Sequence, residues 1–219
     1  MRLEKASQKA IKYACLNFHY SKSVPVNPFA FSVFNDKNEW CRCILYSAGA
    51  NNNLGNQYGL KIGQVIELTR MALNGKQEST SKALSLSIKL LKKHLPLVKL
   101  IVSFADTKQK HIGTIYQATN WFYTETVKTT PDWFFRGRWM HQRQVNSLIG
   151  SLTKLPKDTK KRPGFDKIRY IYPIDKSLIP LCKSLAKPYP KKQAQEVKED
   201  KHDASSIEIG GSSPTLALK

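Results

Sequence analysis

The chain has 219 residues, 41% of them hydrophobic, and carries a formal net charge of +20. This length supports one domain with a substantial core and a modest extension, and leaves little room for two full domains. From Lys191 onward five lysines balance five acidic residues, so the whole positive excess lies in residues 1–190. A folded part this basic predicts a polyanionic partner, because neutralising phosphates releases condensed counterions. The alternative is a basic surface that serves solubility alone.

The same composition bears on the compartment. No apolar stretch approaches the roughly 20 residues of a membrane-spanning helix, and the N-terminus lacks the apolar core of a signal peptide. Cys15, Cys41, Cys43 and Cys182 have no spacing typical of zinc sites or disulfide frameworks. Cys41 and Cys43 are expected on one face of a strand. We therefore expect a cytoplasmic protein with packed thiols and no membrane partner; the oligomeric state stays open.

The first part of the chain predicts a helix, a hairpin and a loop. Apolar residues at helical spacing among lysines indicate an amphipathic helix over residues 3–17, which the following prolines end. FAFSVF and WCRCILYSA flank a run of turn formers at 35–39, a pattern typical of a β-hairpin. Residues 49–59 hold three Gly and four Asn and predict a loop that borders the functional site.

The middle of the chain alternates strand and helix. Residues 64–73 and 98–104 predict strands, with a helix between them that begins at Ser79, Thr80 and Ser81. A second helix is expected over 109–119 and a third strand over 121–127. This order favours an α/β fold in which parallel strands are joined by right-handed crossovers.

Residues 131–173 mix aromatic rings with arginine and lysine, a composition that holds phosphates and can stack bases. Single rings there are also typical packing residues. From Pro188 the chain is polar, charge-balanced and low in aromatics, which predicts a disordered tail. We therefore expect one domain over 1–187, with a basic C-terminal extension, and a tail over 188–219.

Polar side chains occur at the ends of two predicted strands. Thr69 and Arg70 follow one apolar run, and Ser103 and Asp106 end the next. Ligands of open α/β sheets gather outside the carboxyl ends of strands. These residues are therefore expected at a cleft.

The residues around these strand ends resemble the Mom family of phage DNA adenine-modification proteins. The resemblance rests on VIELTR (65–70), VSFADTKQKHIGTIYQATNWFYT (102–124) and HYSKSVP (19–25), and covers roughly residues 10–175. It implies a fold like that of GCN5-related N-acetyltransferases, with a mixed central sheet flanked by helices. It also implies a transferase that places a carbamoylmethyl group on the exocyclic amine of adenine in double-stranded DNA and so protects phage DNA from host restriction. A phage- or prophage-encoded protein of this kind acts in the host cytoplasm.

The predicted catalytic residues are Asp106, Arg70, Tyr116, His19 and Tyr20. The carboxylate of Asp106 suits orienting the amine or accepting its proton; the alternative is that it caps the following helix. Arg70 needs a partner if it is buried, and Glu67, Asp106 or a bound anion would serve. Tyr116 either turns its hydroxyl to the cleft or packs in the core.

The resemblance also implies cofactors. It places His19 and Tyr20 at the family's active site, with His19 as the natural ligand of an iron ion, although a His-Tyr pair by itself is typical of packing. Acetyl-CoA or a related group donor is implied by the fold, with Ser103 as a contact. Ordinary acetyltransferases hold the CoA pyrophosphate in a Gln/Arg-x-x-Gly-x-Gly/Ala loop. This chain instead has NGKQESTS at 74–81, one glycine and a run of hydroxyls at a helix N-terminus.

An adenine inside a duplex hides its amine, so the base is expected to be flipped out and sandwiched between side chains. Trp121, Tyr123 and Trp133 are the sandwich candidates. The predicted DNA-binding residues are Lys108, Lys110, Trp133, Arg136, Arg138, Arg143, Lys160, Lys161 and Arg162.

Two other functions compete with this one. The first is an N-acyltransferase of the same fold that acts on a protein or a small amine. The second is a DNA-binding protein without catalytic activity, for which loss of the Asp106 carboxylate would change nothing.

Overall fold

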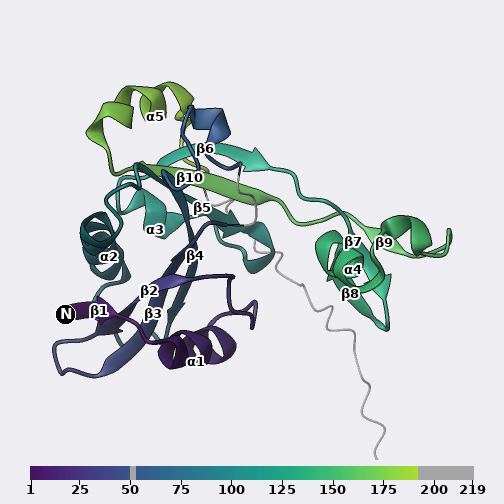
Figure 1. The fold of residues 1–219 in the computed structure, drawn as a ribbon, viewed down its shortest axis with the longest axis horizontal. Coiled ribbons are helices and arrows are strands. Elements are labelled where there is room, and N and C mark those ends of the chain that lie inside the picture. Colours follow the sequence, from purple (N-terminus) through teal and green to yellow (C-terminus); the bar gives the residue numbers. More distant parts are fainter. Residues whose placement is uncertain (50–52, 192–219) are drawn as a thin grey trace, which may run out of the picture.

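The structure is a computed structural model that describes residues 1–49 and 53–191 (Figure 1). A seven-stranded sheet has the order β1-β2-β3-β4-β5-β10-β6, and a three-stranded sheet has the order β8-β7-β9. The large sheet comprises β1 (Arg2–Lys5), β2 (Phe29–Phe34), β3 (Trp40–Ser47), β4 (Val65–Leu73), β5 (Leu100–Asp106), β6 (Phe122–Val127) and β10 (Lys167–Pro173). The small sheet comprises β7 (Asp132–Phe135), β8 (Arg138–His141) and β9 (Lys161–Arg162). The helices are α1 (Gln8–Phe18), α2 (Thr80–His94), α3 (Thr114–Gln117), α4 (Gln142–Ile149) and α5 (Ile179–Leu185), with 3-10 turns η1 (Asn56–Tyr58), η2 (Thr107–Gln109), η3 (Leu152–Lys154) and η4 (Lys176–Leu178).

The N-terminal helix is shorter than predicted. Residues 2–5 form an edge strand that pairs antiparallel with β2, with Leu3 opposite Val33. The helix begins only after Ser7, whose side chain accepts from the backbone N–H of Ala10. The predicted hairpin of β2 and β3 is confirmed.

A bulge in β3 separates two cysteines that were expected on one face. The register shifts between Ser32 and Phe34 of the partner strand, and Arg42 has a φ of 83°. Cys41 therefore packs in the cluster under α2, whereas Cys43 packs in the cluster under α1. The prediction of packed thiols is confirmed, since all four cysteines are free and buried.

The sheet is mixed, as predicted, but its strand order differs from the expected one. β4 and β5 pair in parallel. β10 lies between β5 and β6 and is antiparallel to both, so the expected neighbours β5 and β6 do not touch along the sheet. The helix predicted over 109–119 shrinks to η2 and a four-residue α3, because Gly113 takes a φ of 81° between them.

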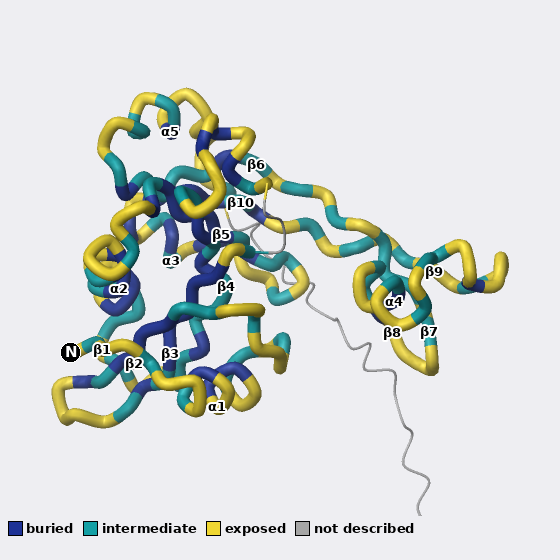
Figure 2. The backbone as a smooth tube through the Cα atoms, in the orientation of Figure 1, coloured by how far each residue is buried: buried dark blue, intermediate teal, exposed yellow. Residues whose placement is uncertain are grey.

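Helices cover both faces of the sheet. Ile11, Ala14 and Cys15 of α1 pack on β3 and β4. On the opposite face α2 and α3 enclose the main cluster, which includes Tyr46 and Trp121. The buried backbone follows the central strands in Figure 2. No helix in the described parts of the chain is long and apolar enough to cross a bilayer.

The small sheet and α4 form a lobe, residues 131–163, that stands away from the large sheet on two extended connections (Figure 1). It has its own small core of Met140, Val145 and Leu155. The predicted 1–187 domain thus contains an inserted lobe. Just past its predicted C-terminal boundary, the Tyr189 hydroxyl still donates to the carbonyl of Trp121 at 2.6 Å. The rest of the predicted tail, 192–219, lies outside the described residues.

Candidate functional site

The site begins where β4 and β5 separate. Their parallel pairing ends at Leu68 opposite Ser103. Immediately after it, a bulge in β4 leaves Thr69 out of register, so that Leu68 lies opposite Tyr46 and Arg70 opposite Leu45. Bulges next to active sites re-aim side chains. The two strands thus part where the polar residues predicted at their ends occur.

A cavity of about 510 Å³ occupies this position. It is bordered by the end of α1, the bulge of β4, the end of β5 and the loop that leads into α3. The lining residues are Phe18, His19, Tyr20, Leu68, Thr69, Arg70, Met71, Phe104, Ala105, Asp106, Lys110, His111, Ile112, Gly113, Thr114, Ile115 and Tyr116. All five predicted catalytic residues lie in this set.

A chain of hydroxyls lies beneath the cavity. The Ser103 hydroxyl donates to the carbonyl of Leu68 at 2.8 Å, so the Tyr116 hydroxyl, 2.8 Å from Ser103, is the donor to the serine oxygen. Burial raises the pKa of Tyr116 to about 12, and the phenol stays protonated at neutral pH. Ser103 is fully buried and does not line the cavity. The structure therefore gives it a positioning role instead of the expected contact with a group donor.

Asp106 and Tyr20 reach the cavity from different elements. Both residues line the cavity, and burial, together with the nearby Asp106 carboxylate, raises the pKa of the Tyr20 phenol to about 12. The phenol therefore stays protonated at neutral pH. Asp106 accepts from the backbone N–H of Lys108 at 2.9 Å, so it caps η2 as well as facing the cavity. The predicted cap is confirmed, and the catalytic role of this carboxylate stays a prediction.

The Arg70 guanidinium has a donor nitrogen without a hydrogen-bond partner among the described residues. One terminal nitrogen donates to the carbonyl of Thr69 at 2.7 Å. The nitrogen without a partner in that part of the chain is Nε, which is buried. An unsatisfied buried donor costs about 1–3 kcal/mol. The cavity wall thus offers a cation with unused hydrogen-bonding capacity, which suits a bound anion or carbonyl.

The predicted iron ion does not fit these residues. The described part of the chain holds no group of three His, Cys, Asp or Glu able to bind a metal. Burial first, and then the charges of Arg70, His111 and Lys22, lower the pKa of His19 to about 4, so the ring is neutral at pH 7. The Nδ1 of His19 accepts from the backbone N–H of Ser21 at 3.2 Å, so the neutral ring carries its proton on Nε2. A ligating histidine needs the reverse arrangement.

The loop at 74–81 does not fit a CoA pyrophosphate either. None of its residues is among those that line the cavity. Ser79 caps α2 by accepting from Lys82 N–H at 3.2 Å and lies 2.9 Å from the Ser81 hydroxyl. The Thr80 hydroxyl accepts from Gln77 at 2.8 Å. These hydroxyls thus have hydrogen-bond partners within the loop, and none of them borders the cavity.

The predicted DNA-binding cations divide between two places. Lys110 lines the cavity, and Lys108 is exposed next to it. The others lie on the lobe, where Arg136, Arg138, Arg143, Lys160 and Lys161 are exposed. Arg162 is half-buried and pairs with Asp132 at 3.1 Å. A second hollow of about 790 Å³ runs along the connection to the lobe and is lined by Lys128, Lys161 and Arg162, among others.

Two of the expected stacking residues are packing residues instead. Trp121 is fully buried in the main core. Trp133 packs against the lobe core. By contrast, Tyr20 is 48% exposed, and its ring meets that of His111 edge-on at 6.4 Å. Tyr20 is thus an accessible ring at the cavity.

Two polar lining residues, His111 and Thr114, were not predicted from the sequence, whereas Thr69 was expected at the cleft. His111 lies in the polar turn after β5, and Thr69 precedes Arg70 in the bulge. His111 could have been predicted from the sequence, because it lies in the polar segment that directly follows the predicted strand. The bulge at Thr69 has no signature in the local sequence.

Comparison with known proteins identifies the family of this chain. The Mom protein family matches residues 1–191. Methylcarbamoylase mom of Escherichia phage Mu is 26% identical over 170 residues, which cover 72% of this chain and 69% of that protein. Solved structures with a similar course of the chain include spermidine/spermine N-acetyltransferase SpeG from Vibrio cholerae, with 10% identity, a TM-score of 0.46, and coverage of 81% of this chain and 94% of that one. A GNAT family acetyltransferase from Elizabethkingia anophelis with acetyl-CoA bound has 11% identity, a TM-score of 0.45, and coverage of 79% and 97%. Scores at this level carry no argument about chemistry. The match over 191 of 219 residues shows that this chain belongs to the Mom protein family.

Proposed function

We propose that the protein is an enzyme that transfers a carbamoylmethyl group to the exocyclic amine, N6, of adenine in double-stranded DNA. The observation that carries the proposal is that Tyr20, Asp106 and Arg70, from three separate elements, line one cavity in a chain of charge +20. The family supports it, since a relative is named a methylcarbamoylase. Such a change to phage DNA would protect it from host restriction.

The cavity requires the adenine to leave the duplex. A volume of about 510 Å³ suits a flipped base and a small group beside it. Unstacking and unpairing cost a few kcal/mol, which contacts between the basic surface and phosphates offset. Tyr20 and His111 present rings on which the extruded base can stack.

The chemistry requires a weak nucleophile to be held and then deprotonated. The lone pair of N6 is delocalised into the purine, so the amine must be aligned with an activated carbamoylmethyl donor, a methylene carbon that bears a leaving group. As the N6–C bond forms, the bond to the leaving group breaks and its electron pair departs with that group. N6 becomes strongly acidic at that moment. Asp106, whose carboxylate lines the cavity, then accepts the proton.

The remaining cavity residues act by position and charge. Arg70 lines the cavity and places its positive charge where it can stabilise the negative charge that develops on the carbonyl or the leaving group of the donor. His19 is neutral at pH 7 because its pKa is about 4, so its Nε2–H is a donor without charge. The hydrogen-bonded pair of Ser103 and Tyr116 fixes the floor on which the base rests.

Nucleoside mass spectrometry tests the proposal. DNA from cells that express the wild-type protein should contain a deoxyadenosine heavier by one carbamoylmethyl group, and should resist restriction enzymes whose sites contain adenine. An acylated protein or small amine with unmodified DNA would instead support the N-acyltransferase of the same fold. Unmodified DNA that is nonetheless bound by soluble protein would support the non-catalytic alternative.

A further inference from the structure

The hairpin of β7 and β8 has an outer face that its own core leaves uncovered. Trp133 and Phe135 point inward and pack on the lobe core with Met140. Phe134 and Trp139 stand opposite each other on the other face, 40% and 38% exposed. Their ring centroids are 5.4 Å apart, edge to face. The lobe thus presents a pair of aromatic rings on a narrow ribbon.

The turn of this hairpin holds an arginine against its conformational preference. Arg136 and Gly137 have φ values of 50° and 75°, and Phe135 pairs with Arg138 on either side of them. Two positive φ values in a two-residue loop indicate a type I′ turn, where Asn-Gly is favoured. An unfavourable residue kept at such a position points to a function for its side chain.

The charge around the aromatic pair has one sign. Arg136 and Arg138 are exposed at the tip, and the guanidinium of Arg162 lies 4.6 Å from the Trp139 ring. Asp132 is the only acidic residue in 131–141, and it pairs with Arg162. A ribbon with aromatic rings between unpaired arginines complements the sugar and phosphate edges of a nucleic-acid groove.

The position of the lobe limits where it can contact DNA. Thr107, directly after Asp106, donates to the carbonyl of Asp166 on the connection to the lobe at 2.7 Å, so the lobe is joined to the cavity edge of the sheet. From Val127, the end of β6, to Arg136 is nine residues, which reach at most about 30 Å when extended. That is just under one turn of B-form DNA, about 34 Å. Val127 itself lies two strands from Asp106 in the sheet, about 10 Å at the usual strand spacing, so the tip lies within about 40 Å of the cavity edge, little more than one helical turn.

We propose that the β7–β8 hairpin enters a groove of the duplex on one side of the target adenine and holds that flank through Phe134, Trp139, Arg136 and Arg138. This inference rests on the proposed function for the identity of the base in the cavity. The inference adds a contact between the hairpin and the DNA on one side of the target adenine, which we call the grip. The grip sets the affinity for duplex DNA and takes no part in the reaction in the cavity.

Binding to duplexes of two lengths tests the grip with the full chain. The long probe has one adenine in about 30 base pairs, roughly three turns. The short one keeps about three base pairs on either side, roughly 10 Å at 3.4 Å per step. The wild type should gain affinity with flank length. Phe134→Ala with Trp139→Ala should bind the long probe roughly tenfold or more weakly. The ratio of long-probe to short-probe affinity should then fall toward one.

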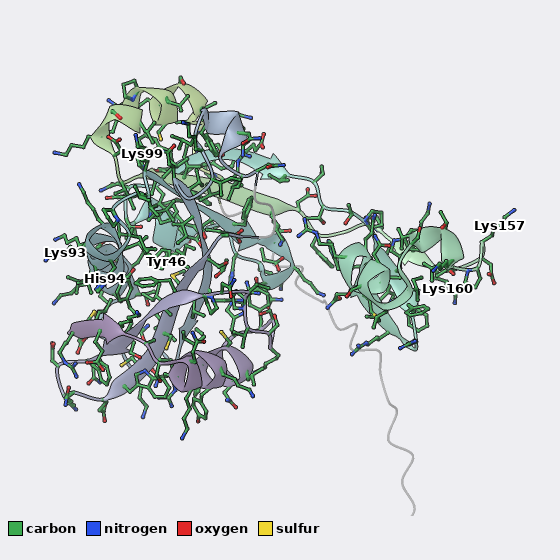
Figure 3. The ribbon with its side chains drawn as sticks, in the orientation of Figure 1. Tyr46, Lys93, His94, Lys99, Lys157 and Lys160 are labelled. Carbon is green, nitrogen blue, oxygen red and sulfur yellow. The ribbon has the colours of Figure 1, made fainter. Side chains whose placement is uncertain are left out.

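A second variant separates binding from folding. Arg136→Asn with Arg138→Gln removes two charges and places the favoured Asn-Gly pair in the turn, so the hairpin should keep its shape. The slope of log affinity against log salt should fall by about 2 in magnitude, one for each lost phosphate contact. The matched control is Lys92→Gln with Lys93→Gln on α2. Figure 3 shows Lys93 at the opposite end of the molecule from Lys157 and Lys160 of the lobe. This control should leave the affinity ratio unchanged.

Hydroxyl-radical footprinting and adenine analysis complete the test. The wild type should protect backbone on one side of the target adenine only, and the hairpin variants should lose that protection. If both hairpin variants bind the long probe as the wild type does, the grip is refuted even when DNA is modified. If the wild type modifies no adenine while hairpin variants still weaken binding, the proposed function fails and the grip stands.

Discussion

The hydroxyl of Ser103 on β5 donates to the carbonyl of Leu68 on β4 at 2.8 Å, at the last position where the two strands pair. Beyond it the strands separate around the cavity. The same serine oxygen is 2.8 Å from the Tyr116 hydroxyl, so one small side chain connects both strands and the helix under the site. The core offers a matching trio for comparison: Ser87 donates to Leu84 at 2.7 Å and lies 2.6 Å from the Tyr46 hydroxyl.

Ser103→Ala should reduce both stability and turnover, because it leaves a buried carbonyl and a buried phenol without their partner. The expected loss is about 1–3 kcal/mol in the free energy of unfolding, measured in urea. Ser87→Ala should cost a similar amount and leave turnover unchanged, since Ser87 is away from the cavity. Equal turnover in the two variants would show that Ser103 is structural only.

Asp106→Asn should abolish adenine modification while DNA binding persists. The amide keeps an oxygen for the Lys108 N–H but cannot take a proton, so the rate should fall roughly 10²–10⁴-fold. Asp175→Asn is the matched control, because Asp175 caps η4 in the same way, accepting from Ser177 N–H at 3.0 Å. Its activity should equal that of the wild type. Full activity in Asp106→Asn would refute the role assigned to this carboxylate.

His19 should make stability depend on pH. Its folded pKa is about 4, lowered chiefly by burial, against about 6.5 in an unfolded chain. The unfolded state therefore binds the proton first, so this contribution to stability is complete above about pH 6.5 and is lost as the pH falls toward 4. Urea unfolding of the wild type and His19→Gln across this range checks it. The wild type should lose more stability than the variant, and identical profiles would contradict the shift.

Gly113→Ala should distort the loop that borders the cavity. A Cβ there would lie 2.3 Å from the Tyr170 ring, and φ is already 81°. Backbone strain and steric overlap together should lower the free energy of unfolding by about 1–3 kcal/mol or more, with reduced adenine modification. Gly75→Ala is the control, since its φ is 80° and nothing lies within 4 Å. The difference between their thermal midpoints isolates the overlap with Tyr170.

Local sequence patterns predicted the elements but not all their neighbours. Ser79 and the leucine spacing located α2, and turn formers located the β2–β3 hairpin, because capping and turn chemistry act over a few residues. The insertion of β10 between β5 and β6 was missed. Residues 167–173 reach that place only after the chain has passed through the lobe, and no local pattern encodes a pairing at that separation.

The same limit applies to the site. Arg70 and Asp106 were expected together because the ends of parallel strands share an edge of the sheet, and they do line one cavity. Tyr20 and Asp106 are 86 positions apart, and they line the same cavity only because of how the segment after α1 folds back. The packing of Trp133 on the lobe core was not foreseen, because alternation in a hairpin does not say which of its two faces is covered.

The two ends of the lobe touch each other. The Thr129 hydroxyl donates to the Phe165 carbonyl at 2.8 Å, and an added Cβ on Gly164 would lie 2.2 Å from Thr129. β6 and β10 already pair up to Val127 opposite Lys167. The lobe from Pro131 to Pro163 is thus an insertion between two strands, β6 and β10, that pair with each other independently of it. Exchanging this lobe between relatives should therefore change which DNA sequences are bound, while the reaction in the cavity stays the same.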